Sequence, residues 1–186
     1  MSISDTERAL SEFEAHYDYD VSYMRYMLTH APTAYGKFEK LTEASAHREA
    51  APVEAAFAAK LVGAVAEDCG PCVQLVADMA REAGVAPDQV EAVLTRDPAR
   101  MSDDTALGFR FADAVVRAAP HEDEAREAVL AQWGEAGLID LVLGLQLGRM
   151  YPMVKKGLGF GKTCKRIQVG NASIPVVKTV LAIEAA

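Results

Sequence analysis

The sequence predicts an all-α protein, a multi-helix bundle, and three observations support this fold class. Apolar residues recur with helical spacing along most of the 186-residue chain, runs of β-branched residues are short, and apolar and polar residues nowhere alternate for long. Hydrophobic residues make up 51% of the chain and charged residues 25%, as in ordinary globular proteins. A chain of this length buries about 70% of its unfolded surface, so it needs no disulfide or metal to fold.

Apolar spacing and helix-boundary residues together place the individual helices. Pro52 and Pro87 suit the first turn of a helix, because the missing N–H has no partner there. Gly84 suits the left-handed position that follows a helix, and Asp103 and Asp104 are able to cap the helix that they precede. The predicted helices span residues 4–16, 20–30, 33–46, 52–66, 69–83, 87–95, 103–119, 122–133 and 135–156.

We divide the chain into three parts: an N-terminal helical extension at 1–50, a helical core at 51–156 and a C-terminal arm at 157–186. The arm is rich in glycine and basic residues and is expected to be irregular, with a short strand or helix at 174–183. Its glycine-rich start at 157–163 fails the spacing of a phosphate-binding loop and follows a helix where that loop needs a strand. No nucleotide site is therefore expected.

Net charge and the N-terminal residues limit the partners and the compartment. The 27 acidic and 19 basic side chains give a formal charge of −8, which argues against nucleic acid and anionic membrane surfaces as partners. No apolar run approaches the roughly 18 residues of a membrane span. The polar, acidic N-terminus is unlike a secretory signal, so we expect a cytoplasmic protein in a reducing environment.

Cys69 and Cys72 form the motif Cys-Gly-Pro-Cys between two predicted helices. We expect Asp68 to be the N-cap of the second helix, with Cys69 in its first turn and Cys72 one turn further on. The N-terminus of a helix favours a thiolate, whereas the charges of Glu67 and Asp68 disfavour one, and the sequence leaves the balance open. Two cysteines so placed can close a tight disulfide, as in dithiol oxidoreductases.

The two cysteines also have other interpretations. They could be two buried small hydrophobic residues, or half of a zinc site whose other half would need Cys164 and a histidine at unsuitable spacing. The tetrapeptide matches thioredoxin, but that motif follows a β-strand, and here helices are predicted on both sides. We expect neither a metal nor an organic cofactor.

Four segments together resemble the carboxymuconolactone decarboxylase family, the fold that includes alkylhydroperoxidase D. They are the Cys-x-x-Cys motif at a helix start, Gly-Val-Ala-Pro-Asp-Gln-Val at 84–90, the helix at 104–117 and the closing helix at 138–150. The match covers about 50–156. The resemblance implies a multi-helix bundle of the alkylhydroperoxidase D-like type that assembles into a homo-oligomer, commonly a dimer, trimer or hexamer, with the first 50 residues as extra helices.

The resemblance also implies a redox activity. In the peroxidase branch the two cysteines reduce a hydroperoxide and become a disulfide; the second cysteine attacks and the first resolves. A glutamate twelve residues before the first cysteine and a histidine four after the second relay the proton. In this chain those positions hold Phe57 and Val76, so the dithiol is present without its familiar base. Which of Cys69 and Cys72 attacks stays open.

Several residues are candidates for the missing relay. Glu54 and Lys60 lie three residues either side of Phe57 on one helical face; Glu54 could relay a proton and Lys60 could stabilise a thiolate, although the simpler interpretation is that both are solvated. His30 and His47, from the extension or from a neighbouring subunit, are further candidates. The candidate catalytic residues are therefore Cys69, Cys72, Glu54, Lys60 and Glu67.

Three hypotheses for the function follow. The first is a dithiol oxidoreductase that reduces a peroxide or exchanges with another thiol, with a thiol reductant protein as a partner. The second is a non-redox enzyme like carboxymuconolactone decarboxylase, acting on a small carboxylated compound. The third is a non-catalytic oligomeric ligand-binding protein of the same fold.

Two apolar helices bear on assembly. The stripe Tyr23, Met24, Met27 and Leu28 is interpreted as core or subunit interface, or alternatively as the entrance to the cysteine site. The segment 138–147 is apolar nearly all round, so it should be buried on all sides. We expect the helices at 20–30 and 138–156 to contribute to subunit contacts.

Overall fold

The computed structural model describes residues 3–161 and 166–176, and its architecture is mostly helical, which confirms the all-α prediction. The helices are α1 (Ile3–Tyr17), α2 (Ser22–His30), α3 (Pro32–Phe38), α4 (Leu41–Ala46), α5 (Val53–Ala66), α6 (Gly70–Glu82), α7 (Pro87–Thr95), α8 (Asp103–Arg117) and α9 (Glu122–Gly157). A 3₁₀ turn spans Pro98–Arg100, and two short strands, β1 (Arg166–Val169) and β2 (Ala172–Pro175), follow.

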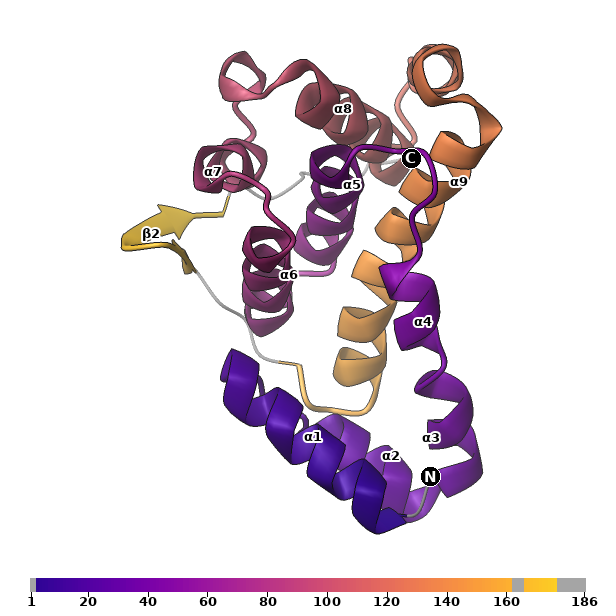
Figure 1. Cartoon of the computed structure of the whole chain (residues 1–186), viewed down its shortest axis with the longest axis vertical. Coiled ribbons are helices and arrows are strands. Elements are labelled where there is room, and N and C mark those ends of the chain that lie inside the picture. The colour runs from indigo at the N-terminus through magenta and orange to yellow at the C-terminus, as the bar shows by residue number, and fades with distance from the viewer. Residues whose placement is uncertain (1–2, 162–165, 177–186) are drawn as a thin grey trace, which may run out of the picture.

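Helix α5 is the central element, and it packs against α6, α7, α8 and α9 (Figure 1). Its sequence is dominated by alanine and valine, and most of its residues are buried. Small residues let neighbouring backbones approach closely. A Cβ on Gly148 of α9 would lie 3.1 Å from the backbone carbonyl carbon of Lys60, so this position needs glycine. The contact holds α9 directly against the half of α5 that carries Lys60.

The N-terminal extension closes one end of the molecule (Figure 1). Helices α1 and α2 lie across that end, while α3 and α4 lead back along α9 toward the start of α5. The buried apolar residues form two clusters. The larger one lies within α5–α9 and the two strands, and the second one is built mainly from the extension. Cys69 and Cys72 belong to the second cluster, so the extension and the cysteine motif share one core.

Several helix boundaries confirm the sequence prediction and two correct it. Helix α7 covers the predicted residues 87–95, Gly84 has the expected positive φ of 91°, and the predicted break near residue 134 is a kink at Gly134 with φ 66°. The predicted helix at 33–46 is instead split into α3 and α4. The cap of α8 is Ser102, whose hydroxyl accepts the backbone N–H of Thr105 at 3.2 Å, rather than an aspartate.

Residues 166–175 of the arm form a β-hairpin, so the expectation of an irregular arm is wrong for this part. Strands β1 and β2 pair antiparallel around a turn at Gly170, and Ile167 faces Ile174 across the pair. Both isoleucines are buried against the large cluster. The side chain of Gln74 on α6 exchanges two hydrogen bonds with the backbone of Gln168, at 2.9 and 2.7 Å. The rest of the predicted segment, 177–183, lies outside the described residues.

The length of helix α9 raises the question of whether it could cross a membrane. By length and apolar composition it is the one helix in the described ranges that would suffice to cross a membrane. Core helices of soluble proteins meet the same criterion, and α9 packs against α5 and α8. Its Asp140 is buried and accepts backbone N–H groups of residues 49–51 at 2.8–3.1 Å. The fold is consistent with a soluble protein, and the cytoplasmic location stays a prediction.

Candidate functional site

The turn between α5 and α6 places the two cysteines. Asp68 has a left-handed backbone (φ 53°), which aspartate tolerates better than most residues. An N-cap needs an extended backbone, and Cys69 has one (φ −109°, ψ 92°). Cys69, and not Asp68 as predicted, is therefore the N-cap of α6. Pro71 follows in the first turn, where its missing N–H costs nothing, and Cys72 completes that turn.

Cys69 and Cys72 are joined by a disulfide, with their Cα atoms 5.3 Å apart. Both residues are buried, with exposed fractions of 4% and 3%. The apolar residues around them come from α1, the α1–α2 connection and α2, and include Leu10, Tyr19 and Tyr23. The extension thus covers a cysteine pair that would otherwise lie at the open end of α6.

Tyr19 is the polar residue that meets the disulfide. Its hydroxyl lies 3.5 Å from the Sγ of Cys72, within hydrogen-bond distance of sulfur. The ammonium of Lys155 lies 4.2 Å from the centroid of the Tyr19 ring and donates to the carbonyl oxygen of Asp20 at 2.9 Å. Burial raises the pKa of Tyr19 to about 12. The phenol therefore stays protonated at neutral pH and can donate to a thiolate at Cys72.

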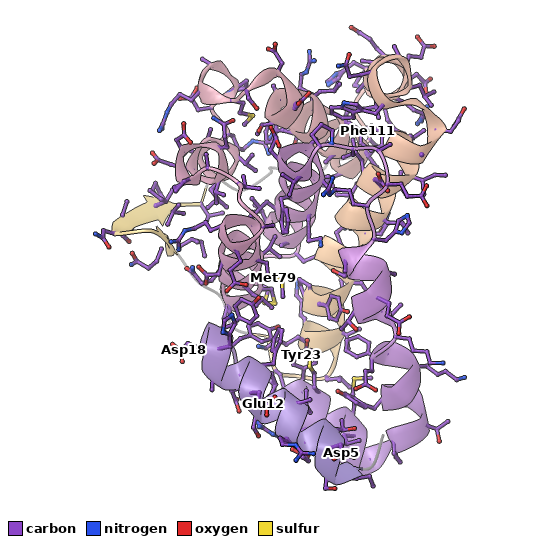
Figure 2. All side chains as sticks on the ribbon, in the orientation of Figure 1. Asp5, Glu12, Asp18, Tyr23, Met79 and Phe111 are labelled. Atoms are coloured by element: carbon purple, nitrogen blue, oxygen red, sulfur yellow. A yellow bond between two sulfur atoms is a disulfide. The ribbon has the colours of Figure 1, made fainter. Side chains whose placement is uncertain are left out.

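A cavity of about 490 Å³, partly open to solvent, lies beside Cys72 between the extension, α5, α6 and α9. Figure 2 shows Tyr23 of α2 and Met79 of α6 on two sides of this space. Phe57 and Val76, which occupy the relay positions of the resembled family, both line it with apolar side chains. The further lining residues are mostly aromatic and aliphatic and include Leu10, Phe13, Met24, Tyr35, Phe38, Leu75, Leu147 and Tyr151.

The stripe on α2 belongs to this site. Tyr23 and Met24 line the cavity, and Leu28 and Met27 lie in the same apolar cluster as the two cysteines. The core interpretation given to the stripe from sequence is therefore confirmed for Tyr23 and Leu28, which are buried, and Tyr23 and Met24 in addition line the cavity beside Cys72.

Lys60 also lines the cavity and is not a solvated side chain. Its ammonium donates to the backbone carbonyl and the hydroxyl of Ser45, at 2.6 and 3.2 Å, and lies 5.1 Å from the centroid of the Phe57 ring. Burial lowers the pKa of Lys60 to about 8. The side chain is therefore a cation held in a mainly apolar environment, and a part of it is neutral at mildly alkaline pH.

The two predicted carboxylates lie elsewhere. Glu67 accepts a hydrogen bond from the guanidinium of Arg149 at 2.8 Å, so this ion pair offsets the charge that would oppose a thiolate. Glu54 lies at the opposite end of α5 and does not line the cavity. Burial and the negative charge of Glu54 together raise the pKa of Asp104 on α8, which places Glu54 near that residue. The structure therefore does not bring Glu54 together with the cysteines.

Neither histidine candidate reaches the cavity. His30 packs against the ring of Tyr26, with centroids 4.4 Å apart, and His47 lies 3.6 Å from a carboxylate oxygen of Asp140. Within residues 3–161 and 166–176, no group of three histidine, cysteine or carboxylate side chains is arranged to hold a metal ion. Cys164, which a zinc site would have needed, lies outside the described residues.

Sequence reasoning missed Tyr19, although a signal was present, since five of the six tyrosines fall in residues 17–35. No protein-family model, curated protein or solved structure matches this chain. The function must therefore be argued from the residues of the site.

Proposed function

We propose that the chain is a dithiol oxidoreductase in which Cys69 and Cys72 cycle between dithiol and disulfide. The observation that carries this proposal is the position of Cys72. Its sulfur lines an apolar cavity and lies 3.5 Å from a buried phenol, while its disulfide partner is one helical turn away. A thiolate at Cys72 would have a hydrogen-bond donor, a nearby resolving thiol and room for a substrate.

The peroxide reaction would proceed in two steps. The thiolate of Cys72 attacks the hydroperoxide oxygen, the O–O bond breaks, and the substrate leaves as an alcohol after taking up one proton, so that Cys72 becomes a sulfenic acid. The thiol of Cys69 then attacks the sulfur of Cys72, water leaves, and the disulfide forms. A dithiol reductant restores both thiols by exchange. Exchange with another thiol is the alternative use of the same pair.

Cys72 is assigned as the attacking residue because it lines the cavity, whereas Cys69 does not. The proton relay of the resembled family is replaced by apolar side chains at Phe57 and Val76. Tyr19 supplies a hydrogen bond in its place but, with a pKa of about 12, is a poor base. We therefore propose a slow peroxidase.

We further propose that α5–α9 form a core of the alkylhydroperoxidase D-like type. The two positions at which the resemblance expects a relay, 57 and 76, line the same cavity as Cys72, which supports this assignment. A homo-oligomeric state and a cytoplasmic location belong to the same proposal.

Single-cysteine variants test the redox proposal. After reduction and one equivalent of hydrogen peroxide, the wild type should lose two daltons within residues 69–72, and a dithiol should restore the mass. The Cys69→Ser variant should stop at a sulfenic acid on Cys72 that a sulfenate trap labels. Cys72→Ser should remain unlabelled. If both thiols of the wild type alkylate fully after peroxide, the proposal is wrong.

The cavity also favours a second candidate, a non-catalytic ligand-binding protein. The volume of about 490 Å³ falls in the range of small-molecule sites, and the lining combines apolar residues with a few polar groups. In that case a ligand would bind equally well to the wild type and to the Cys69→Ser/Cys72→Ser variant, and peroxide would not be consumed.

A further inference from the structure

The chemistry of the cavity identifies a class of ligand. Its walls are apolar over most of their area, and its cationic lining residue, Lys60, comes from α5. The Lys60 ammonium donates to the carbonyl and the hydroxyl of Ser45, and both acceptors are neutral. No carboxylate of the described ranges lies within 4.0 Å of this ammonium. A partly buried cation without a counter-charge in a mainly apolar environment is unfavourable, and an anionic ligand would relieve it.

A polar group without a hydrogen-bond partner among the described residues faces the same space. The hydroxyl of Tyr151 on α9 is buried and has no hydrogen-bond partner among the described residues. Burial raises the pKa of Tyr151 to about 12, so the phenol keeps its proton and can donate to a ligand oxygen. Because Gly148 has no side chain, α9 packs directly against the backbone of Lys60. The turn of α9 that runs from Gly148 to Tyr151 therefore lies beside that lysine. Two donors are thus available in one apolar cavity.

We propose that this cavity binds an apolar monocarboxylate, with the carboxylate held by Lys60 and the hydrocarbon chain among the aromatic and aliphatic side chains of α1, α2 and α6. A neutral apolar molecule would leave the Lys60 ammonium without a counter-charge, and a cation would be repelled by it. Glu39 is the carboxylate among the lining residues, and it is half-exposed. The cavity volume of about 490 Å³ lies within the range of small-molecule sites, so such a ligand fits.

Because Cys72 lines the same cavity, the proposed ligand class also suggests a substrate class. This step rests on the proposed redox function. Cys72 lies in the wall supplied by α6 and Lys60 in the wall supplied by α5. A carboxylate anchored at Lys60 would leave the chain free to carry a hydroperoxide to the sulfur. The preferred substrate would then be a hydroperoxide of an apolar carboxylic acid, reduced to the corresponding hydroxy acid.

Binding is tested on the disulfide form, without any turnover, by calorimetric titration with decanoate, decanol and decylamine. Decanoate should bind most tightly, and Lys60→Met should weaken decanoate roughly tenfold to a hundredfold, the range of a charge-assisted hydrogen bond. The affinity for decanol should stay unchanged in Lys60→Met. Lys37→Met, at an exposed position on α3, is the matched control and should bind decanoate like the wild type. Equal affinities for decanoate and decanol, or unchanged decanoate binding by Lys60→Met, would overturn the proposal.

Kinetics with two hydroperoxides separates this inference from the redox proposal. The KM for ω-hydroperoxydecanoate should lie below that for decyl hydroperoxide. Lys60→Met should remove this difference, whereas the exposed control Lys37→Met should keep it and keep kcat for the neutral substrate. Decanoate binding without any peroxide consumption would contradict the redox function and leave the binding site in place. Turnover of both hydroperoxides with equal KM would contradict the substrate class and leave the redox function in place.

Discussion

The hydroxyl of Tyr19 lies 3.5 Å from the Sγ of Cys72, although 53 positions separate the two residues in the chain. This contact joins the N-terminal extension to the cysteine motif of the core. It means that the extension contributes a polar group to the site in addition to covering it. The site is therefore built from two parts of the chain, the extension and the core.

Replacing Tyr19 by phenylalanine should make the reduced Cys72 less reactive. The phenol of Tyr19 donates a stronger hydrogen bond to a thiolate than to a neutral thiol, so it stabilises the charged form of Cys72. Its loss should therefore raise the pKa of the Cys72 thiol. We expect alkylation of Cys72 by iodoacetamide at neutral pH, measured in a Cys69→Ser background, to slow about tenfold, as for one lost charge-assisted hydrogen bond. Tyr26→Phe is the control, because Tyr26 is exposed and packs against His30. Equal rates in all three proteins would contradict the role of Tyr19.

Introducing the relay of the resembled family should accelerate peroxide reduction. Phe57 and Val76 line the cavity with Cys72, so Phe57→Glu combined with Val76→His would put a base and a proton shuttle beside the sulfur. General acid–base assistance contributes about 10²–10⁴-fold, and we expect a gain of at least tenfold in kcat/KM for a hydroperoxide. The pair Phe57→Gln and Val76→Asn adds similar polarity without a base and should show no gain. A native rate that the relay variant does not exceed would mean that the chain already contains a base.

Lys60 should destabilise the folded protein at neutral pH. Burial lowers its pKa to about 8 from its ordinary value of 10.5, so between these pH values the unfolded chain holds one more proton and stability rises with pH. Below pH 8 the penalty is fully present, and above about 10.5 it is gone. The ionisable groups that share the cavity are Tyr19, Tyr23, Tyr35, Glu39, Cys72 and Tyr151. Burial raises the pKa values of the four phenols, so they stay neutral in this window, and Cys72 is in the disulfide.

The measurement compares Lys60→Met with the exposed control Lys37→Met. Urea unfolding at pH 7 should show Lys60→Met to be more stable by about 1–3 kcal/mol, and the difference should shrink as the pH approaches 10.5. A pH-independent difference would instead indicate that the gain comes from packing alone.

Asp140 should be essential for the junction between the extension and α5. Its carboxylate accepts the backbone N–H groups of Glu49, Ala50 and Ala51, and removing it leaves donors without a partner. We expect Asp140→Ala to lower the free energy of unfolding by about 2–3 kcal/mol. Burial would raise the pKa of Asp140, but the three backbone hydrogen bonds and nearby His47 outweigh it, so the pKa is lowered. This stability is present above the ordinary pKa of an aspartate and is lost as the pH falls through the lowered value.

The control for Asp140 is Asp123→Ala, at an exposed position in the first turn of α9. Its unfolding free energy should stay close to that of the wild type, and it should keep the loss of stability in acid that Asp140→Ala no longer shows. An Asp140→Ala protein as stable as this control would contradict the account.

The outer face of α9 should form a subunit contact. The sequence analysis expected the segment 138–147 to be buried on all sides, but Ile139 and Val142 are 53% and 40% exposed, and Met153 further along is 52% exposed. A row of exposed apolar residues on one helix is typical of an interface. Sedimentation equilibrium should therefore show a species larger than the 20.0 kDa monomer. Ile139→Asp should dissociate it, whereas Ile3→Asp, at another exposed isoleucine, should not. A wild type that sediments as a monomer would refute the contact.

Local patterns in the sequence determined most of the secondary structure and the existence of the cysteine pair. Helix α7, the break at Gly134 and the left-handed Gly84 follow from apolar spacing and from residues that begin or end helices. Such effects act over one or two turns, so the sequence alone reports them. The cap of α6 was misplaced by one residue, because Asp68 and Cys69 both suit the turn and only the observed backbone decides between them.

Only the tertiary structure decided what surrounds the cysteines. The simplest interpretation of Lys60 from sequence was a solvated side chain, but it is partly buried because α4 and α9 pack around that half of α5. Tyr19 meets Cys72 because α1 and α2 lie across the end of the core. These contacts join residues far apart in the chain, and each depends on how several apolar faces pack at once. Periodicity identifies the apolar face of a helix, but it does not specify which other face will cover it.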